Sequence, residues 1–167
     1  MTAADLPRMC DWLNEPHVME FYTREPRTLA GVTEHYLGRI TGRDPTHPFI
    51  ALAGATPIGY FQAYRLADYP DYAAALGAEP DAAGVDMLIG DPAYAHRGLG
   101  APLLRQFLAE VVWELTGATA CWIGPSVRNT RAIRAYEKAG FTYQRTVHIA
   151  GEDDPEYVMR LAVSAGA

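Results

Sequence analysis

The turn HRGLGA, residues 96–101, combines the residue types of an anion-binding site. It lies between a strand-like segment that ends at Gly90 and a long helical pattern. The first backbone N–H groups of a helix have no partner within it, and the helix dipole is positive there, so both attract an anion. Gly98 and Gly100 would let a phosphate approach the backbone, and Arg97 adds a positive charge. The turn predicts a phosphate site, with a plain glycine turn as the alternative.

This turn fits neither of two common phosphate motifs. No GK[ST] follows it, which excludes a P-loop, and the third glycine of a dinucleotide fingerprint is missing. The ligand must therefore be identified from the second half of the chain.

Three further side chains have types and positions suited to chemistry. Asp86 lies in the strand-like segment GVDMLIG, and a carboxylate on a buried strand needs a partner. Asn129 begins the helical block NTRAIRAYEKAGF, and Tyr136 follows two turns later, so both can face the same side. A helix cap is the alternative role for Asn129, and a core position is the alternative for Tyr136.

Hydrophobic periodicity predicts the elements that position these residues. The sequence predicts helices from a Thr2 capping box to the NEPH segment and over 28–41, 98–115 and 129–140. It predicts strands in a hairpin over 49–66 with its turn at 54–57, and over 84–90, 118–124, 141–149 and 156–163. We expect the last two strands to be antiparallel and 67–83 to be a long loop. This order indicates a mixed α/β domain.

Length and composition indicate one soluble domain over residues 1–167. No run approaches the ~18 apolar residues of a membrane span, and the first residues do not form a signal peptide, so we expect a cytoplasmic protein with no membrane partner. The two cysteines have no metal-ligand spacing with the five histidines, so no metal site is expected.

Charge bears on the possible partners. The net charge is −6, which repels nucleic acid and attracts a polycationic small molecule. Residues 68–86 carry five acids and no base, and residues 151–156 carry four acids in six positions. Surface acids also serve solubility alone, so charge by itself leaves the partner open.

Two motifs together resemble the GNAT superfamily of N-acetyltransferases. In that family R/Q-x-x-G-x-G/A opens the helix that binds the coenzyme A pyrophosphate, and N-x-x-A-x-x-x-Y-x-x-x-G-F follows the next strand. The second motif is complete here, in Asn129, Ala132, Tyr136, Gly140 and Phe141. The first departs at its Arg or Gln position, which is Ala95. The resemblance implies the GNAT fold, a mostly antiparallel twisted central sheet with a splayed strand pair and flanking helices.

Within this superfamily, much of the chain resembles the aminoglycoside 6′-N-acetyltransferases of antibiotic resistance. The segments that carry the likeness are DLPRMCDWLNEPHVMEFY, GVTEHYL, HPFIALAGATPIGYFQAY and NTRAIRAYEKAGFTYQRTV. Acyltransferases of siderophore synthesis share LIGDP, but they usually carry histidine at the position of Asp86, where the antibiotic enzymes carry aspartate. The resemblance therefore implies acetyl transfer from acetyl-CoA to the 6′-amine of an aminoglycoside.

The resemblance also implies which residues bind the coenzyme. The backbone of the Asp86 strand would contact the pantetheine arm, the turn would hold the pyrophosphate, and the Asn129 helix would lie on the other side of the arm. The implied coenzyme-binding residues are Leu88, Ile89, His96, Arg97, Gly98, Leu99, Gly100, Ala101, Pro102, Asn129, Ala132 and Tyr136.

Catalytic and substrate roles follow by the same resemblance. Tyr136 would act as general acid toward the departing thiolate, and Asp86 would receive the proton of the amine. Because an ordinary aspartate has a pKa of about 3.9, Asp86 would mainly position the amine while water carries the proton. The implied substrate-binding residues are Tyr64, Asp71, Asp86 and either Asp153 or Asp154.

This chain departs from the antibiotic enzymes near the substrate. Their tryptophans after the Asp71 position are replaced by YAAAL, and the acid expected before PS is Gly124. Two alternatives therefore stay open, a siderophore-precursor acyltransferase and a non-catalytic acyl-CoA binding module whose acidic loops bind a cationic partner. The sequence is compatible with a monomer or a homodimer.

Overall fold

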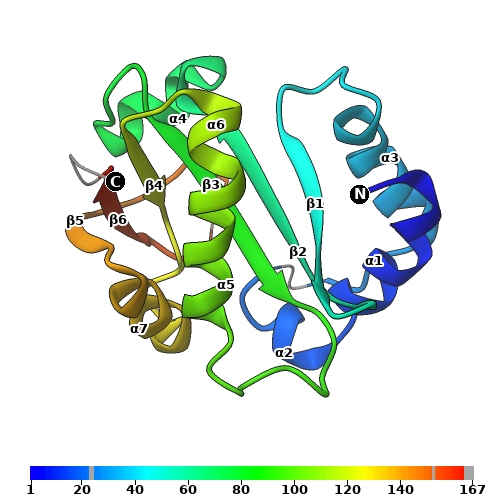
Figure 1. The fold of residues 1–167 in the computed structure, drawn as a ribbon. Helices are drawn as coiled ribbons and strands as arrows, with labels where there is room; N and C mark the ends of the chain where they lie inside the picture. Colours follow the sequence, from blue (N-terminus) through cyan, green and yellow to red (C-terminus); the bar gives the residue numbers. More distant parts are fainter. Residues whose placement is uncertain (23–24, 152, 164–167) are drawn as a thin grey trace. The chain divides into compact units, whose positions relative to one another are not determined.

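The computed structural model describes residues 1–22, 25–151 and 153–163. Within these ranges, helices flank a mostly antiparallel sheet of six strands (Figure 1). The chain divides into two compact units, the first made of residues 1–62 and 86–99 and the second of residues 63–85 and 100–167. Strands β2 (Thr56–Arg65) and β3 (Ala83–Ile89) contribute residues to both units. The mixed α/β class is confirmed, and the expectation of a single domain stays a prediction.

The first unit carries the N-terminal helices and its part of the sheet, in the strand order β1-β2-β3. Its remaining elements are η1 (Ala3–Asp5), α1 (Leu6–Leu13), α2 (Pro16–Met19), α3 (Leu29–Ile40) and β1 (His47–Ala53). The expected capping interaction is present, because the Asp5 carboxylate accepts a hydrogen bond from the Thr2 backbone at 2.7 Å. Thr28 caps α3 by accepting from Gly31 N at 3.2 Å.

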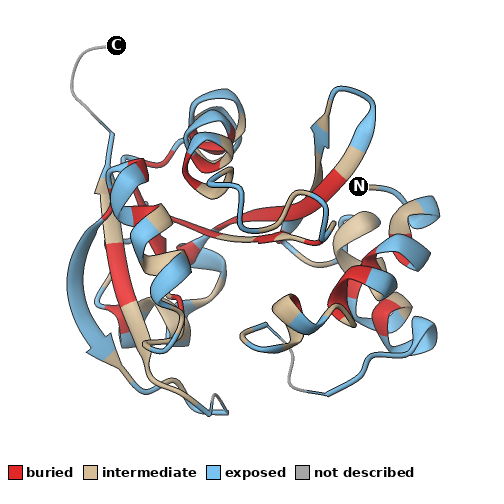
Figure 2. Ribbon diagram, turned by 90° about the horizontal axis from the view of Figure 1, so that it is seen from below, coloured by how far each residue is buried: buried red, intermediate tan, exposed pale blue. Residues whose placement is uncertain are grey.

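The apolar core of the first unit lies between α1, α3 and the strands (Figure 2). Its buried members are Leu6, Met9, Trp12, Leu13, Val18, Val32, Tyr36, Tyr60 and Leu88. Removal of these large side chains from water is the main stabilising contribution to this unit. The packing fixes α3 and β2, which carry the polar residues described below.

The second unit has the strand order β2-β3-β4-β6-β5. Its elements besides β2 and β3 are η2 (Leu66–Asp68), α4 (Pro70–Leu76), α5 (Gly100–Phe107), η3 (Leu108–Val112), α6 (Trp113–Thr116), β4 (Ala120–Ile123), α7 (Thr130–Ala139), β5 (Thr142–Val147) and β6 (Glu156–Ala162). Strand β4 pairs with β3 in parallel, where Ala83 faces Cys121, and with β6 in antiparallel. The expected antiparallel pairing of β5 with β6 is confirmed.

The structure corrects the expectation that residues 67–83 form a long loop. Residues 66–68 form a 3₁₀ turn. The helix α4 begins at Pro70 and ends at Leu76, and the next residue, Gly77, has a φ of +66°. Proline suits the first turn of a helix and glycine suits the left-handed residue after the last turn. A helix of two turns repeats its apolar position too few times to show a clear period, which is why the sequence pattern missed it.

The long helix predicted over 98–115 is present with two differences. It begins at Gly100, because Gly98 has a φ of +76° and cannot be helical. Residues 108–112 form a π-helical segment between α5 and α6, which widens one turn. Among the described residues, no helix combines the length and the apolar character needed to cross a bilayer.

Candidate active site

Asp86 of β3 is held by a buried side-chain amide in the first unit. Its Oδ2 accepts a hydrogen bond from Gln62 Nε2 of β2 at 2.6 Å. The Oε1 atom of Gln62 accepts two bonds, one from the Tyr60 hydroxyl and one from Arg39 Nη1 of α3, each at 2.7 Å. These four side chains form a connected polar group, here called the Gln62 network. It gives Asp86 the partner that a carboxylate on a buried strand requires.

The β2 strand explains how two members of this network meet. Side chains of a strand alternate between faces, so Tyr60, Gln62 and Tyr64 share one face. Tyr60 is completely buried and Gln62 exposes 7% of its surface. Of these three residues, only Tyr64 was predicted from the sequence as a site residue, and Tyr60 and Gln62 were not. The available signal was a single amide in the otherwise apolar and aromatic run PIGYFQAY.

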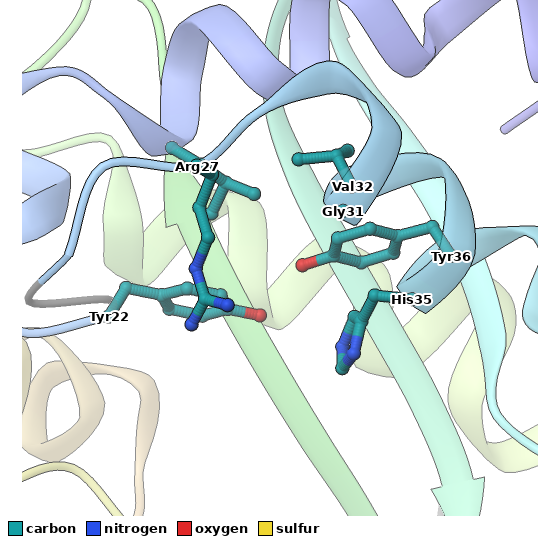
Figure 3. Close-up of a pocket in the computed structure, with 7 residues that line it drawn as sticks. Tyr22, Arg27, Gly31, Val32, His35 and Tyr36 are labelled. Atoms are coloured by element: carbon teal, nitrogen blue, oxygen red, sulfur yellow. The ribbon is translucent and has the colours of Figure 1, made fainter.

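A pocket in the first unit contains aromatic and basic side chains (Figure 3). It has a volume of about 160 Å³ and is lined by Leu13, Tyr22, Arg27, Gly31, Val32, His35 and Tyr36. The side chains of Tyr22 and Tyr36 are hydrogen-bonded to each other. None of these residues was predicted from the sequence as a site residue, because the pocket depends on how α1, α3 and the segment between them pack.

Residues of the pocket and of the Gln62 network interact electrostatically. Burial raises the pKa of the Tyr60 and Tyr36 phenols, and the negative charge of Asp86 raises both further. Both phenols therefore stay protonated at neutral pH and can donate hydrogen bonds. Burial and the charge of Arg39 lower the pKa of His35, so its neutral form is favoured. The Arg39 guanidinium also lies over the Tyr36 ring, 5.2 Å from its centroid.

The predicted coenzyme residues of the first unit form the end of β3 and the turn after it. Leu88 is buried, and the Ile89 carbonyl accepts a hydrogen bond from His17 Nε2 at 2.9 Å. His96 and Gly98 have φ values of +60° and +76°. A left-handed conformation is ordinary for glycine but uncommon for a residue with a side chain, so His96 is the unusual position of this turn. His17 was not predicted from the sequence. Its ring also packs edge to face against that of His96, with the two ring centroids 5.8 Å apart.

Two predicted residues of the second unit lie on or next to α7. Asn129 caps the helix, since its Oδ1 accepts from the Ala132 backbone at 3.0 Å. Tyr136 exposes 7% of its surface, and its ring centroid lies 6.3 Å from that of Phe141. The cap role of Asn129 and the burial of Tyr136 are thus established, and the roles of both residues toward the coenzyme stay predictions.

The predicted substrate residues of the second unit differ in their surroundings. Tyr64 is buried, with its ring 5.1 Å from that of Tyr69. Asp71 in the first turn of α4 is exposed, as is Asp153. Asp154 instead accepts from Ser126 Oγ at 3.1 Å and lies 3.5 Å from Arg128 Nη1. Asp154 thus forms an ion pair with Arg128.

An acid that the sequence analysis missed, Glu156, lies beside Gly124. The carboxylate of Glu156 accepts a hydrogen bond from the Tyr72 hydroxyl at 2.9 Å. A Cβ atom at Gly124 would collide with this carboxylate. The Glu156 carboxylate, which extends from β6, thus lies where the side chain of the acid expected at position 124 would be. Sequence reasoning could not place it because the contact joins distant segments.

The structure groups the predicted residues by unit. The first unit holds Asp86, Leu88, Ile89, His96, Arg97, Gly98 and Leu99, and the second holds Tyr64, Asp71, Gly100, Ala101, Pro102, Asn129, Ala132, Tyr136, Asp153 and Asp154. No cluster of three or more His, Cys, Asp or Glu side chains suited to a metal occurs in the part of the chain that the structure describes.

Comparison with known proteins gives consistent matches. Residues 1–149 match the model of a family described as acetyltransferase (GNAT) domain. The aminoglycoside N(6′)-acetyltransferase type 1 of Klebsiella pneumoniae is 37% identical over 149 residues, which cover 88% of this chain and 74% of that protein.

Solved structures are similar over nearly the whole chain. The aminoglycoside acetyltransferase AAC(6′)-Ib in complex with coenzyme A and kanamycin has a TM-score of 0.79 and 35% identity, over 97% of this chain and 91% of that chain. The same enzyme with paromomycin and acetyl-CoA has a TM-score of 0.80 and 34% identity, over 97% of this chain and 90% of that chain.

Proposed function

Because the chain belongs to the GNAT family of acetyltransferases, we propose that it transfers an acetyl group from acetyl-CoA to the 6′-amine of an aminoglycoside, a reaction that confers antibiotic resistance. The observation that carries this proposal is the Asp86 carboxylate, which Gln62 holds at 2.6 Å. The similarity to aminoglycoside acetyltransferases identifies the amine class that such a carboxylate would face. A cytoplasmic location and a monomer or homodimer belong to the same proposal.

The turn after β3 fits a coenzyme pyrophosphate. Apart from Gly98 and its two chain neighbours, no atom of the described residues lies within 4 Å of the place where a Cβ of Gly98 would stand, so the backbone there is open to a ligand. Arg97 is exposed, and α5 begins three residues later, at Gly100, with its first N–H groups unpaired by the helix. We assign the pyrophosphate to residues 96–102 and the pantetheine arm to Leu88, Ile89, Asn129, Ala132 and Tyr136. Acetyl-CoA would supply the activated acetyl group as a thioester.

Asp86 is proposed to attract and orient the ammonium of the substrate. Its carboxylate is a weak base, so proton removal would proceed through water with Asp86 stabilising the cation that forms. The Gln62 donor favours the ionised form of Asp86, because a hydrogen bond to a carboxylate stabilises its charge. This arrangement suits the holding of a cation better than the abstraction of a proton.

Tyr136 is proposed as the general acid. A phenol is protonated at neutral pH, so its hydroxyl can give a proton to the departing sulfur. Its position in α7 is rigid, because Asn129 caps the start of the helix and Phe141 packs against the Tyr136 ring. A rigid donor keeps the distance to the leaving group constant.

The acids of the second unit are proposed to bind the other ammonium groups. Asp71 and Asp153 are exposed, and Glu156 adds a half-buried carboxylate oriented by Tyr72. Asp154 is paired with Arg128, which partly balances its charge. The net charge of −6 strengthens the attraction of a polycation.

Release of free thiol from acetyl-CoA over a panel of amines tests this function. The panel contains kanamycin, tobramycin, paromomycin with its 6′-hydroxyl, lysine and a polyamine. We expect turnover with kanamycin and tobramycin and none with paromomycin. Turnover of lysine alone would favour the siderophore-precursor reaction. If no amine gives thiol release but acetyl-CoA raises the Tm, the result would favour a binding module and refute the proposed activity.

A further inference from the structure

We propose that Gln62 is a positioning residue for Asp86, and that Arg39 and Tyr60 lock its amide in the orientation that donates to the carboxylate. The catalytic importance of this positioning rests on the proposed function. The positioning itself is a property of the folded chain and can be measured without turnover.

The orientation of the Gln62 amide follows from its partners. An arginine guanidinium has only donors, so the atom 2.7 Å from Arg39 Nη1 must be the amide oxygen. The NH₂ group then faces Asp86, which must accept. Rotation of the amide by half a turn would bring two donors together at Arg39 and two acceptors together at Asp86. Arg39 therefore selects one orientation of Gln62, which Tyr60 alone would not do because a hydroxyl can donate or accept.

Burial makes this orientation costly to lose. Gln62 exposes 7% of its surface and Tyr60 none, so water cannot readily replace a missing partner. The Arg39 side chain exposes 15%, and its Nε lies 3.8 Å from Asp44 Oδ2, an ion pair on the other edge of the guanidinium. The three hydrogen bonds that converge on the Gln62 amide thus favour one orientation of that amide.

Three phenols also interact electrostatically with Asp86. Tyr36 from α3 and Tyr60 from β2 are buried, and burial raises the pKa of each. Tyr22, from the segment after α2, is partly exposed. These groups stay neutral through the pH range in which a carboxylate titrates. The Gln62 donor then adds a direct hydrogen bond that stabilises the ionised form of Asp86. Its removal should raise the pH at which Asp86 takes up a proton.

The test is a titration of the Asp86 side-chain carboxyl by ¹³C NMR in the full chain, with the signal assigned through Asp86→Asn. We expect Gln62→Met to raise the titration midpoint by about one pH unit, and Arg39→Met to raise it by less. The matched control is Gln106→Met, the same substitution at an exposed glutamine of α5, which should leave the midpoint unchanged. If Gln62→Met does not fold, Gln62→Glu keeps the bonds to Arg39 and Tyr60 and should also raise the midpoint.

Kinetics give a second readout. In Gln62→Met we expect the acidic limb of the kcat/KM profile to move in the same direction as the NMR midpoint, with the KM for acetyl-CoA unchanged. If the wild-type protein acetylates no aminoglycoside, the proposed function is refuted. The NMR titration alone would then test the positioning role of Gln62. An unchanged Asp86 midpoint in a folded Gln62→Met or Gln62→Glu protein would overturn the positioning role, whether or not an antibiotic is acetylated.

Discussion

The carboxylate of Glu156 occupies the space into which a side chain at Gly124 would extend. Gly124 follows β4, Glu156 begins β6, and the Tyr72 hydroxyl fixes the Glu156 carboxylate at 2.9 Å. The resemblance leads us to expect an acid at position 124. The carboxylate of Glu156, from the neighbouring strand, lies where the side chain of that acid would extend.

This relationship predicts that Gly124→Asp destabilises the protein and that Glu156→Ala relieves the effect. The new Cβ would push the Glu156 carboxylate, the flexible end of its side chain, away from the Tyr72 hydroxyl, and the second negative charge would repel it. We expect Gly124→Asp to lower the free energy of unfolding by about 1 kcal/mol, which urea denaturation would measure. The double variant should regain most of this loss. Purely additive effects of the two substitutions would contradict the shared site.

The fold was largely predictable from local patterns, and its exceptions have physical causes. The α7 helix was found because Asn129 and Gly140 are strong cap signals at its two ends. The α4 helix was missed because two turns built largely of alanine show no apolar period. The π segment in 108–112 was missed because its buried residues, Leu108 and Val112, are four positions apart, a spacing that an α-helix also gives.

The candidate site was less predictable, because its contacts join residues distant in the sequence. Asp86 and Asn129 were found through local motifs. The hydrogen bond from Gln62 to Asp86 joins residues 24 positions apart and depends on strand register. Arg39 enters the network from a helix whose packing no local pattern describes. Motifs thus identify the residues that carry chemistry, and tertiary structure identifies those that orient them.

Asp86→Asn should lower kcat with kanamycin at least ~100-fold, because the amide loses the charge that attracts and stabilises the ammonium. The fold should persist, since the Asn side-chain oxygen can still accept from Gln62. The measurement is steady-state thiol release combined with a thermal melt. Asp11→Asn, an identical change at an exposed position of α1, serves as the control. Full activity in Asp86→Asn would remove this residue from the mechanism.

Tyr136→Phe should lower kcat about 100-fold and leave the Kd of coenzyme A nearly unchanged, because only the proton donor is lost. The ring would still pack against Phe141, so stability should change little. Calorimetric titration with coenzyme A and single-turnover kinetics separate binding from chemistry. Tyr143→Phe removes an exposed hydroxyl and should affect neither quantity. If Tyr136→Phe turns over at the wild-type rate, Tyr136 has only a packing role.

Glu79 connects three segments of the second unit. Its Oε1 accepts from Arg160 Nε of β6 at 2.6 Å, and its Oε2 accepts from Trp122 Nε1 of β4 at 2.7 Å. Burial opposes ionisation of Glu79, but the hydrogen bonds from Arg160 and Trp122 outweigh it and lower the pKa below the usual 4.5. The ionised form is therefore more stable in the folded chain than in the unfolded chain.

This shift predicts a pH dependence of stability. A carboxyl whose pKa is lowered by folding contributes stability that is fully present above its unfolded pKa and is lost as the pH falls through its folded pKa. The contribution of Glu79 should thus be present at neutral pH and decline below about pH 4.5. We expect Glu79→Gln to lower the free energy of unfolding by about 1 kcal/mol at pH 7, a modest effect because the side chain is 36% exposed.

At lower pH the difference between Glu79→Gln and the wild-type protein should shrink and approach zero, since protonation of Glu79 removes the same charge. Urea denaturation at several pH values between 7 and 3 measures this convergence. Glu137→Gln, at an exposed position of α7, controls for the general effect of removing one carboxylate. If the difference in free energy of unfolding stays constant across this range, the charge of Glu79 does not contribute to stability. Its contacts with Arg160 and Trp122 would then act as neutral hydrogen bonds.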